Sequence, residues 1–246
     1  MILLIDAGNT RIKWRVVEAS APLAARDEGA FAHDALDALP SALTDVRARH
    51  PGLQRVLGCN VAGAAVAARI AGACAGLSLE WLTSTAACAG VRNLYEDPSQ
   101  LGADRWAAAI GARALHPHAC LVVMAGTATT VDLLSGTAEF LGGLILPGVA
   151  LMQQALARGT AQLPLADGRF ALQPRRTVDA IHSGCLQAQA GAIERMFAQI
   201  AHAPDALCLL GGGAADSFAD LLQIPVRRVE NLVLSGLGAV AGLAAA

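Results

Sequence analysis

The sequence has little charge, no excess of basic residues and no long uninterrupted apolar run. Only 15% of its 246 residues are charged, and the formal net charge is −2. A chain with this balance presents no basic field for nucleic acid and no polybasic patch for a membrane surface. We therefore expect neither nucleic acid nor a membrane among its partners.

Membrane-spanning segments are the first possibility that a mean hydropathy of +0.47 raises. The longest uncharged stretches are 140–157, which is broken by proline, paired glycines and glutamines, and the run after Glu230, which is rich in glycine and alanine. Neither offers about 20 predominantly apolar residues in a row. The chain also lacks the charged segment that opens a signal peptide. We expect a cytoplasmic protein.

Metal and redox motifs of the usual kinds are missing as well. The six cysteines, at positions 59, 74, 88, 120, 185 and 208, include no C-x-x-C pair, which argues against a zinc site or a redox motif. His116 and His118 flank Pro117 with no third ligand nearby in the sequence, so we expect no metal there. Free, mostly buried thiols in a reducing cytoplasm are the expectation.

The chain opens with a strand, a polar turn and a second strand. In "LLIDAGNTRIKW" the apolar run 2–5 leads into Asp6, Gly8, Asn9 and Thr10, and Lys13 follows in the next extended run, 12–17. This pattern predicts a β-hairpin. The turn is unusual in carrying an acid, an amide and a hydroxyl beside a lysine.

A second stretch, "CLVVMAGTATTVDLL" at 120–134, repeats this pattern. Aligning Gly8 with Gly126 places Met124 opposite Asp6. Strands alternate with helices after each hairpin, which indicates an α/β architecture, and the repeat predicts two halves, 1–117 and 118–246. The further strands are expected at 22–30, 55–59, 79–82, 139–146, 206–210 and 226–229, and the helices at 35–50, 63–75, 149–157, 178–200, 214–222 and the C-terminus, with another beginning near Asp104.

Two glycine-bearing hairpin turns can hold a polyphosphate. Glycine lets the backbone approach phosphate oxygens, and exposed N–H groups form an anion-binding concavity. Lys13 supplies positive charge, and Asp6 is suited to magnesium held through water. The alternative is that Asp6 and Asn9 satisfy only turn backbone. Both hairpins together, with a third glycine cluster at 211–213, favour a nucleotide.

The motifs "DAGNTRIKW", "LGADRW", "GTATT", "GGLILPG" and "LLGGGAAD" occur in an order that resembles the type III pantothenate kinases. That family belongs to the acetate and sugar kinase, Hsc70 and actin superfamily, and the resemblance runs from Ile2 to 230–237. It implies duplicated ribonuclease-H-like or actin-like halves, with mixed sheets and an interdomain nucleotide cleft. It also implies phosphorylation of pantothenate by ATP to 4'-phosphopantothenate, the first step of coenzyme A biosynthesis.

The resemblance assigns residues to two groups. The ATP and phosphate group would be Asp6, Gly8, Asn9, Thr10, Lys13, Gly126, Thr127, Gly211 and Gly212, with Asp6 also on Mg²⁺. The substrate group would be Tyr95, Gly102, Ala103, Asp104, Arg105, Gly143 and Thr177, with Gly142, Pro147 and Gly148 shaping the pocket wall. Thr177 matches a position that reaches the partner subunit's substrate, which implies a homodimer with shared sites.

Asp104 would be the base that accepts the proton of the attacking hydroxyl; the alternative is a plain helix N-cap. The guanidinium of Arg105 would pair with the carboxylate of pantothenate; the alternative is a solvent-facing helix charge. Tyr95 could bind substrate or cap its loop. For Asp132, structural and functional roles both stay open. The glycines at 238 and 242 are expected to permit close helix packing.

Met124 departs from the family pattern. The family has an aspartate there that helps hold a monovalent cation, K⁺ or NH₄⁺. A thioether is a poor ligand for such a cation, so we expect a weaker dependence on potassium. Two alternative functions also remain: another small-molecule kinase of the same superfamily, and a nucleotide-sensing regulator without turnover.

Overall fold

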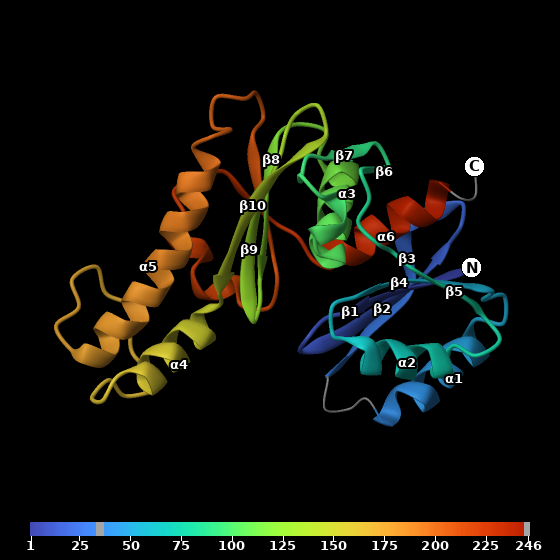
Figure 1. Ribbon diagram of the computed structural model, residues 1–246, viewed down its shortest axis with the longest axis horizontal. Helices are drawn as coiled ribbons and strands as arrows, with labels where there is room; N and C mark the ends of the chain where they lie inside the picture. Colours follow the sequence, from blue (N-terminus) through green and yellow to red (C-terminus); the bar gives the residue numbers. More distant parts are fainter. Residues whose placement is uncertain (33–36, 244–246) are drawn as a thin grey trace. The chain divides into compact units, whose positions relative to one another are not determined.

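The computed structural model describes residues 1–32 and 37–243, which form two compact units (Figure 1). Unit 1 contains the described residues up to Pro117, residues 138–140, and the chain from Asn231 onward. Unit 2 contains His118–Thr137 and Leu141–Glu230. The division of the chain into domains 1–117 and 118–246 stays a prediction. The C-terminal helix packs within unit 1. Within the described ranges, no helix is long and apolar enough to cross a membrane.

Unit 1 is built on a five-stranded sheet of order β3-β2-β1-β4-β5. Strand β1 is antiparallel to β2 and parallel to β4. The strands are β1 (Ile2–Ala7), β2 (Arg11–Glu18), β3 (Ala21–Ala32), β4 (Arg55–Asn60), β5 (Ser78–Trp81), β6 (Ala87–Cys88) and β7 (Val91–Asn93). The helices are α1 (Leu39–Arg49), α2 (Ala64–Ala73), the 3-10 helix η2 (Pro98–Gln100), α3 (Ala103–Leu115) and α6 (Leu232–Leu243).

Both faces of this sheet are covered, which explains the unbroken apolar run of β1. Leu3 and Ile5 pack into a core with α1 and α2. Helix α6 contacts β1 and β4 and also packs on α3. Leu4 is fully buried although it points to the face opposite Leu3 and Ile5. Strands buried on both faces read as continuous hydrophobic runs.

Helices α3 and α6 approach closely because glycines meet at their contact. A Cβ on Gly111 would overlap the carbonyl of Leu232, and one on Gly236 would overlap the carbonyl of Ala107. The glycines expected to allow helix packing, Gly238 and Gly242, instead face Pro22 of β3. They let α6 approach β3 closely, as expected, and Gly236 is the α6 glycine at the contact with α3.

Unit 2 repeats the plan of unit 1. Its strands belong to a seven-stranded sheet of order β12-β11-β8-β9-β10-β7-β6. Read from β10, the order β10-β9-β8-β11-β12 matches β3-β2-β1-β4-β5 of unit 1. Strands β8 and β9 are antiparallel, and β8, β11 and β12 are parallel. The elements are β8 (Cys120–Ala125), β9 (Ala128–Leu134), β10 (Glu139–Pro147), α4 (Val149–Gly159), α5 (Thr177–Phe197), β11 (Leu207–Gly211), η3 (Ala215–Ser217), η4 (Ala219–Leu221) and β12 (Val226–Arg228). The predicted duplicated α/β fold is confirmed.

Two expected elements differ. The helix predicted at 214–222 is wrong: the segment forms two short 3-10 helices, since Phe218 leaves the helical region at φ −139° and buries its ring. The first residues of the helix predicted at 35–50 lie outside the described residues, and α1 begins at Leu39. Strands β6 and β7 were not predicted, because two or three residues carry no readable periodicity.

Candidate active site

Hairpin β1–β2 places Asp6 and Lys13 side by side. They are direct cross-strand partners, so both side chains leave the same face of the sheet. This is the face opposite Ile5 and Ile12, which pack on α1 and α2. The turn is closed by the N–H of Gly8, which donates to the carbonyl of Arg11 at 3.1 Å. Asn9 and Thr10 lie exposed at its tip.

Asp104 lies in the first turn of α3 rather than at its N-cap. The N-cap residue is Gly102, which has no side chain to cap with, and Asp104 accepts a hydrogen bond from the N–H of Arg105 at 2.8 Å. The N-cap alternative for Asp104 is therefore wrong. A Cβ on Gly102 would lie 2.7 Å from Asp104 Oδ1, so glycine leaves this carboxylate its space.

Asp6, Lys13 and Asp104 interact electrostatically within unit 1. Burial raises the pKa of Asp6 to about 6, Lys13 opposes the rise, and Asp104 adds to it. Cys59, the neighbour of Asp6 on β4, also has a raised pKa, mainly through burial and further through Asp6 and Asp104. The motifs "DAGNTRIK" and "GADR", far apart in the sequence, thus meet at one place in the fold.

Arg105 is buried, with 6% of its surface exposed. Its Nη1 donates to the hydroxyl of Tyr95 at 2.8 Å. The guanidinium carbon lies 5.7 Å from the ring centre of Tyr95 and 5.6 Å from that of Phe140, a distance at which cation–π attraction operates. The alternative of a solvent-facing charge is therefore wrong. The sequence predicted neither the burial of Arg105 nor its contact with the ring of Phe140.

Unit 2 brings the "GTATT" turn and the "LLGGG" segment together. Gly212 has φ +97°, and a Cβ there would overlap the carbonyl of Ala125 at the end of β8. The N–H of Ala214 donates to that same carbonyl at 3.1 Å. Gly148 lies under the turn, where its N–H donates to Thr127 at 2.9 Å. Gly126 and Thr127 are exposed.

Met124 takes the place in β8 that Asp6 takes in β1. Its cross-strand partner is Thr130 and its parallel neighbour is Gly211. The sulfur of Met124 lies 3.2 Å from the point where a Cβ on Gly211 would stand. Within the described residues, the buried hydroxyl of Thr130 has no hydrogen-bond partner. The predicted alignment of Met124 with Asp6 is confirmed, and neither Met124 nor its partner Thr130 carries a charge.

The other singled-out residues lie elsewhere. Thr177 is exposed at the start of α5. Asp132 is 1% exposed and lies beneath Gly143, where a Cβ would overlap its carboxylate. His118 lies 3.7 Å from Asp205, and no group of three His, Cys, Asp or Glu side chains that could hold a metal occurs in the part of the chain that the structure describes.

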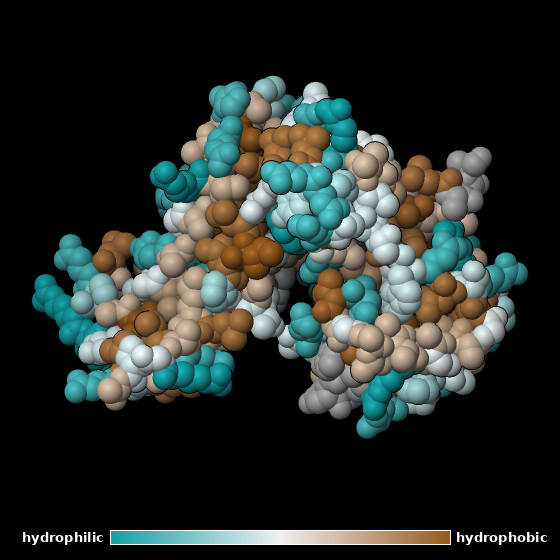
Figure 2. Space-filling model, in the orientation of Figure 1, coloured by the Kyte–Doolittle hydropathy of each residue, from teal (hydrophilic) through white to brown (hydrophobic). Residues whose placement is uncertain are grey.

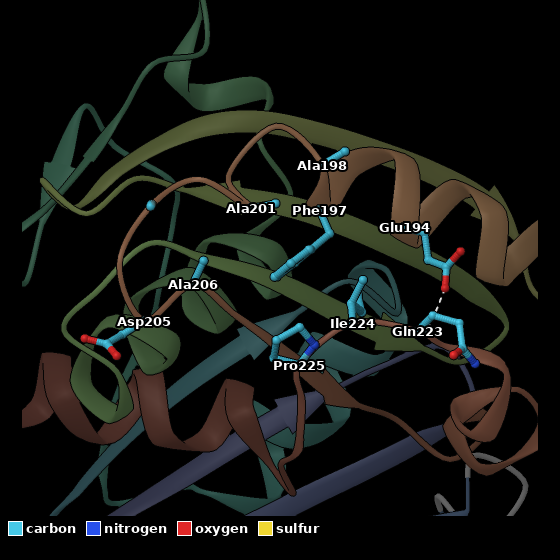
Figure 3. Close-up of a pocket in the computed structure, with 10 residues that line it drawn as sticks. Glu194, Phe197, Ala198, Ala201, Asp205, Ala206, Gln223, Ile224 and Pro225 are labelled. Carbon is cyan, nitrogen blue, oxygen red and sulfur yellow. Dashed lines mark hydrogen bonds between the residues drawn. The ribbon is translucent and has the colours of Figure 1, made fainter.

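A pocket of about 620 Å³ lies in unit 2 and contains none of the predicted site residues. Figure 3 shows it at the C-terminal end of α5, with Phe197 and Ile224 lining it and Glu194 accepting the backbone N–H of Gln223 at 2.6 Å. Its lining is mostly alanine and other apolar side chains. It has no feature of a phosphoryl-transfer site.

Comparison with known proteins identifies the family. The family model for type III pantothenate kinases matches residues 2–199. A type III pantothenate kinase from Aromatoleum aromaticum is 60% identical and covers 98% of both chains. One from Azoarcus sp. is 54% identical and covers 100% of this chain and 92% of its own.

A solved structure shows the likeness at the level of the fold. A protein from Sinorhizobium meliloti, described as a 2-dehydro-3-deoxygalactonokinase, has a TM-score of 0.62 at 17% identity, covering 100% of this chain and 99% of its own. At this identity the similarity concerns the fold alone. The family match and the relatives carry the assignment: the chain belongs to the type III pantothenate kinase family.

Proposed function

We propose that this chain transfers the γ-phosphoryl group of ATP to pantothenate, giving 4'-phosphopantothenate in coenzyme A biosynthesis, with Asp104 as the proton acceptor. Membership of the type III pantothenate kinase family supports the reaction. The observation that carries the residue assignment is the electrostatic coupling of Asp6, Lys13 and Asp104 within unit 1. It joins the residues expected at the phosphates to the residue expected at the nucleophile.

In this reaction the hydroxyl oxygen of pantothenate forms a bond to the γ-phosphorus while the bond to the ADP oxygen breaks. The hydroxyl proton passes to the carboxylate of Asp104. The N–H of Arg105, which donates to that carboxylate, fixes its orientation. Because Asp104 is only partly buried, an acceptor hydroxyl can reach it.

A magnesium ion fits the charges around Asp6. Burial is the main cause of the raised pKa of Asp6, and repulsion by Asp104 adds to it. A divalent cation would relieve that repulsion and favour the ionised form. With no third protein ligand among the described residues, the donor set suits an ion that keeps several waters and binds phosphate oxygens. Mg²⁺ would neutralise charge on the phosphates, and Asp6 would hold it through water.

The remaining phosphate contacts come from turns. Asn9 and Thr10, exposed at the tip of the first turn, would offer donors to anionic oxygens, Gly8 would let the backbone approach them, and Lys13 adds charge. Gly126 and Thr127 offer the same in the second hairpin. Gly211 and Gly212 would bind near the nucleoside, at a turn held against β8 by the hydrogen bond from Ala214 to Ala125.

Pantothenate carries a carboxylate, and Arg105 is the cation suited to it. A guanidinium has five N–H donors in a fixed fork, so donation to Tyr95 leaves others for the carboxylate. The aromatic faces of Tyr95 and Phe140 orient that fork. Gly102 and Ala103 would line the same wall.

A homodimer is part of the proposal. Large apolar side chains are exposed over β10, α4 and the segment that leads to α5, and they lie among hydrophilic ones in Figure 2. They are Leu141, Leu144, Ile145, Leu151, Leu156, Leu165, Phe170 and Leu172. Such a surface is suited to burial against a second copy. Thr177 begins α5 next to this segment, where it would reach the substrate of the partner subunit.

The monovalent cation of the family does not fit this chain. The place of the expected carboxylate is taken by Met124, beside Thr130 and Gly211, and a thioether is a weak acceptor. We infer a reduced dependence on potassium. A cytoplasmic location also belongs to the proposal, since all six cysteines are free thiols.

An assay of ADP release tests the function. ADP should form from MgATP with pantothenate, but not with a panel of sugars or without an acceptor. Release with a sugar would favour another kinase of the superfamily, and nucleotide binding without acceptor-dependent release would favour a regulator. Asp104→Asn is the matched variant, in which acceptor-dependent release should fall while nucleotide binding stays.

A further inference from the structure

Asn93, at the end of β7, makes three hydrogen bonds with one side chain, two within the loop that follows it and one to Ser84. Its Oδ1 accepts the backbone N–H of Tyr95 at 3.0 Å. Its Nδ2 donates to Ser84 Oγ at 3.1 Å and to the carbonyl of Pro98 at 3.2 Å. The side-chain amide can be placed in only one orientation, because a carbonyl must receive a donor and an N–H must meet an acceptor. Asn93 is 5% exposed.

These bonds fix the loop that carries Tyr95. The loop leaves β7 at Asn93 and returns at Pro98, the start of η2, so one amide holds both ends. The N–H of Leu94 adds a bond to the carbonyl of Phe140 at 3.1 Å. Tyr95 is thereby held at its backbone by Asn93, while its ring packs on Phe140, with centres 5.7 Å apart.

The ring and hydroxyl of Tyr95 in turn orient the guanidinium of Arg105. The Tyr95 hydroxyl accepts from Nη1, and the Tyr95 and Phe140 rings stand at similar distances from the guanidinium carbon. A shift of the loop therefore moves both the hydroxyl acceptor and one of the two aromatic faces. Asn93 itself reaches neither Arg105 nor Asp104 in any of these contacts.

We propose that Asn93 is a positioning residue for pantothenate binding, acting through Tyr95 on Arg105. The proposal rests on the proposed function, in which Arg105 and Tyr95 bind the substrate. Loss of the Asn93 amide removes the partner of the Tyr95 N–H and leaves the Pro98 carbonyl only the longer bond from Leu101 at 3.4 Å, which is costly in this partly buried place and loosens the loop. Nothing in this chain of contacts touches the phosphate hairpin, so binding of ATP is unaffected.

Steady-state kinetics of Asn93→Ala with each substrate test the inference. KM for pantothenate should rise about tenfold, equal to about 1.4 kcal/mol of binding, with KM for ATP within about twofold of the wild type. Asn93→Ser keeps an oxygen that can accept the Tyr95 N–H, and its KM for pantothenate should lie between the other two. Equal rises in both KM values, or none in either, would overturn the positioning role.

The matched control is Asn60→Ala. Asn60 has the same pattern of bonds in the same unit: its Oδ1 accepts from Ala62 at 3.1 Å and its Nδ2 donates to the carbonyl of Gly63 at 3.0 Å. Its loss should lower the melting temperature as Asn93→Ala does, without changing KM for pantothenate. An equal rise of that KM in Asn60→Ala would mean that general loosening, and not positioning, explains Asn93.

A double-mutant cycle separates action through Tyr95 from independent effects. In a Tyr95→Phe background, Asn93→Ala should raise KM for pantothenate less than about threefold, because the hydroxyl it positions is gone. A full tenfold rise there would overturn the proposed route. If Asn93→Ala does not fold, Asn93→Ser and Ser84→Ala replace it in the cycle. Each should raise KM for pantothenate less in the Tyr95→Phe background than in the wild type.

Arg105→Ala distinguishes this inference from the proposed function. If Arg105→Ala raises KM for pantothenate and Asn93→Ala does not, the positioning role fails and the substrate assignment stands. If Arg105→Ala also leaves that KM unchanged, the substrate assignment itself fails, and the role of Asn93 with it.

Discussion

Hairpin β1–β2 carries Asp6 opposite Lys13, whereas hairpin β8–β9 carries Met124 opposite Thr130, each pair one residue before an Ala-Gly turn. The strands that continue each sheet from β1 and β8 are the parallel β4 and β11. The backbone plan is therefore the same in the two units. The charges are present in one and absent in the other.

The difference shows which part of the duplicated plan is kept for folding and which for chemistry. Strand order and turn glycines recur in both units because they set the backbone. The charged pair of the first hairpin is replaced by Met124 and Thr130 in the second, so the phosphate contacts proposed for unit 2 would come from backbone and hydroxyl donors. In unit 1, Asp104 of α3 also acts on the charge of Asp6.

The largest expected effect comes from Asp104→Asn, which removes the acid next to the first hairpin. Turnover should fall by roughly 10²- to 10⁴-fold, the usual range for a lost general base. Folding and ATP binding should persist because the amide keeps the size of the side chain. Single-turnover kinetics measure the fall in turnover. The control is Asp216→Asn, which replaces an exposed acid of unit 2. Near-normal turnover in Asp104→Asn would remove the base from the proposal.

Asp6→Asn leaves the first hairpin without an acid at the position where the second has Met124. Magnesium-dependent turnover should fall by roughly 10²- to 10³-fold, the range for loss of one electrostatic stabiliser of the transition state. Pantothenate binding should stay measurable by calorimetry without nucleotide, since Asp6 belongs to the phosphate side. If pantothenate affinity falls as far as in Arg105→Ala, the division of roles between Asp6 and Arg105 is wrong.

Most features of the two hairpins could be predicted from the sequence, because they depend on residues that are adjacent in the chain. Both hairpins, their turn glycines and the place of Met124 follow from adjacent residues. The burial of Arg105 could not be read, since Phe140 comes from β10 and Tyr95 from a separate loop. An asparagine before a loop resembles any turn residue, which hid Asn93.

The helix predicted at 214–222 failed for a similar reason. The pattern of apolar residues there fits a helix, but the start of the segment is fixed by contacts with β8. Gly212 takes a positive φ against Ala125, and Ala214 donates to the same carbonyl. Tertiary contacts of this kind override local propensity.

The stability of the two hairpins should differ in its pH dependence. Because the pKa of Asp6 is raised from 3.8 to about 6 in the folded state, the folded chain binds more protons than the unfolded chain between these values. This contribution to stability is present below pH 4 and is lost as pH rises to 6. The free energy of unfolding of Asp6→Asn should therefore exceed that of the wild type by about 3 kcal/mol at pH 7, and by little at pH 4.

Urea titrations across this pH range measure the effect, with Met124→Leu as the matched change in the second hairpin. Met124→Leu should shift the curve equally at both pH values, since no charge is involved. A gain in Asp6→Asn that is the same at pH 4 and pH 7 would mean that ionisation of Asp6 is not its source.

Met124→Asp gives the second hairpin an acid where the first has one. Turnover should gain a dependence on potassium of about tenfold, corresponding to about 1.4 kcal/mol, while wild type responds weakly. The comparison is made in sodium, potassium and ammonium salts at equal ionic strength, with Met124→Leu as control. An absolute potassium requirement in wild type, unchanged by Met124→Asp, would show that other groups hold the ion.

The smallest expected effect is that of Thr130→Val, which removes a hydroxyl from the partner position of Met124. This hydroxyl is buried and without a hydrogen-bond partner among the described residues. Replacing an unsatisfied buried hydroxyl by a methyl group of similar shape removes its desolvation cost. We expect the free energy of unfolding to rise by up to about 1 kcal/mol, measured by urea titration, with turnover unchanged. Thr129→Val, whose hydroxyl is also buried and unpartnered on the opposite face of β9, is the matched variant. A loss of turnover confined to Thr130→Val would mean that this hydroxyl contacts a ligand, and the second hairpin would then contribute a side-chain group where its backbone alone was expected to act.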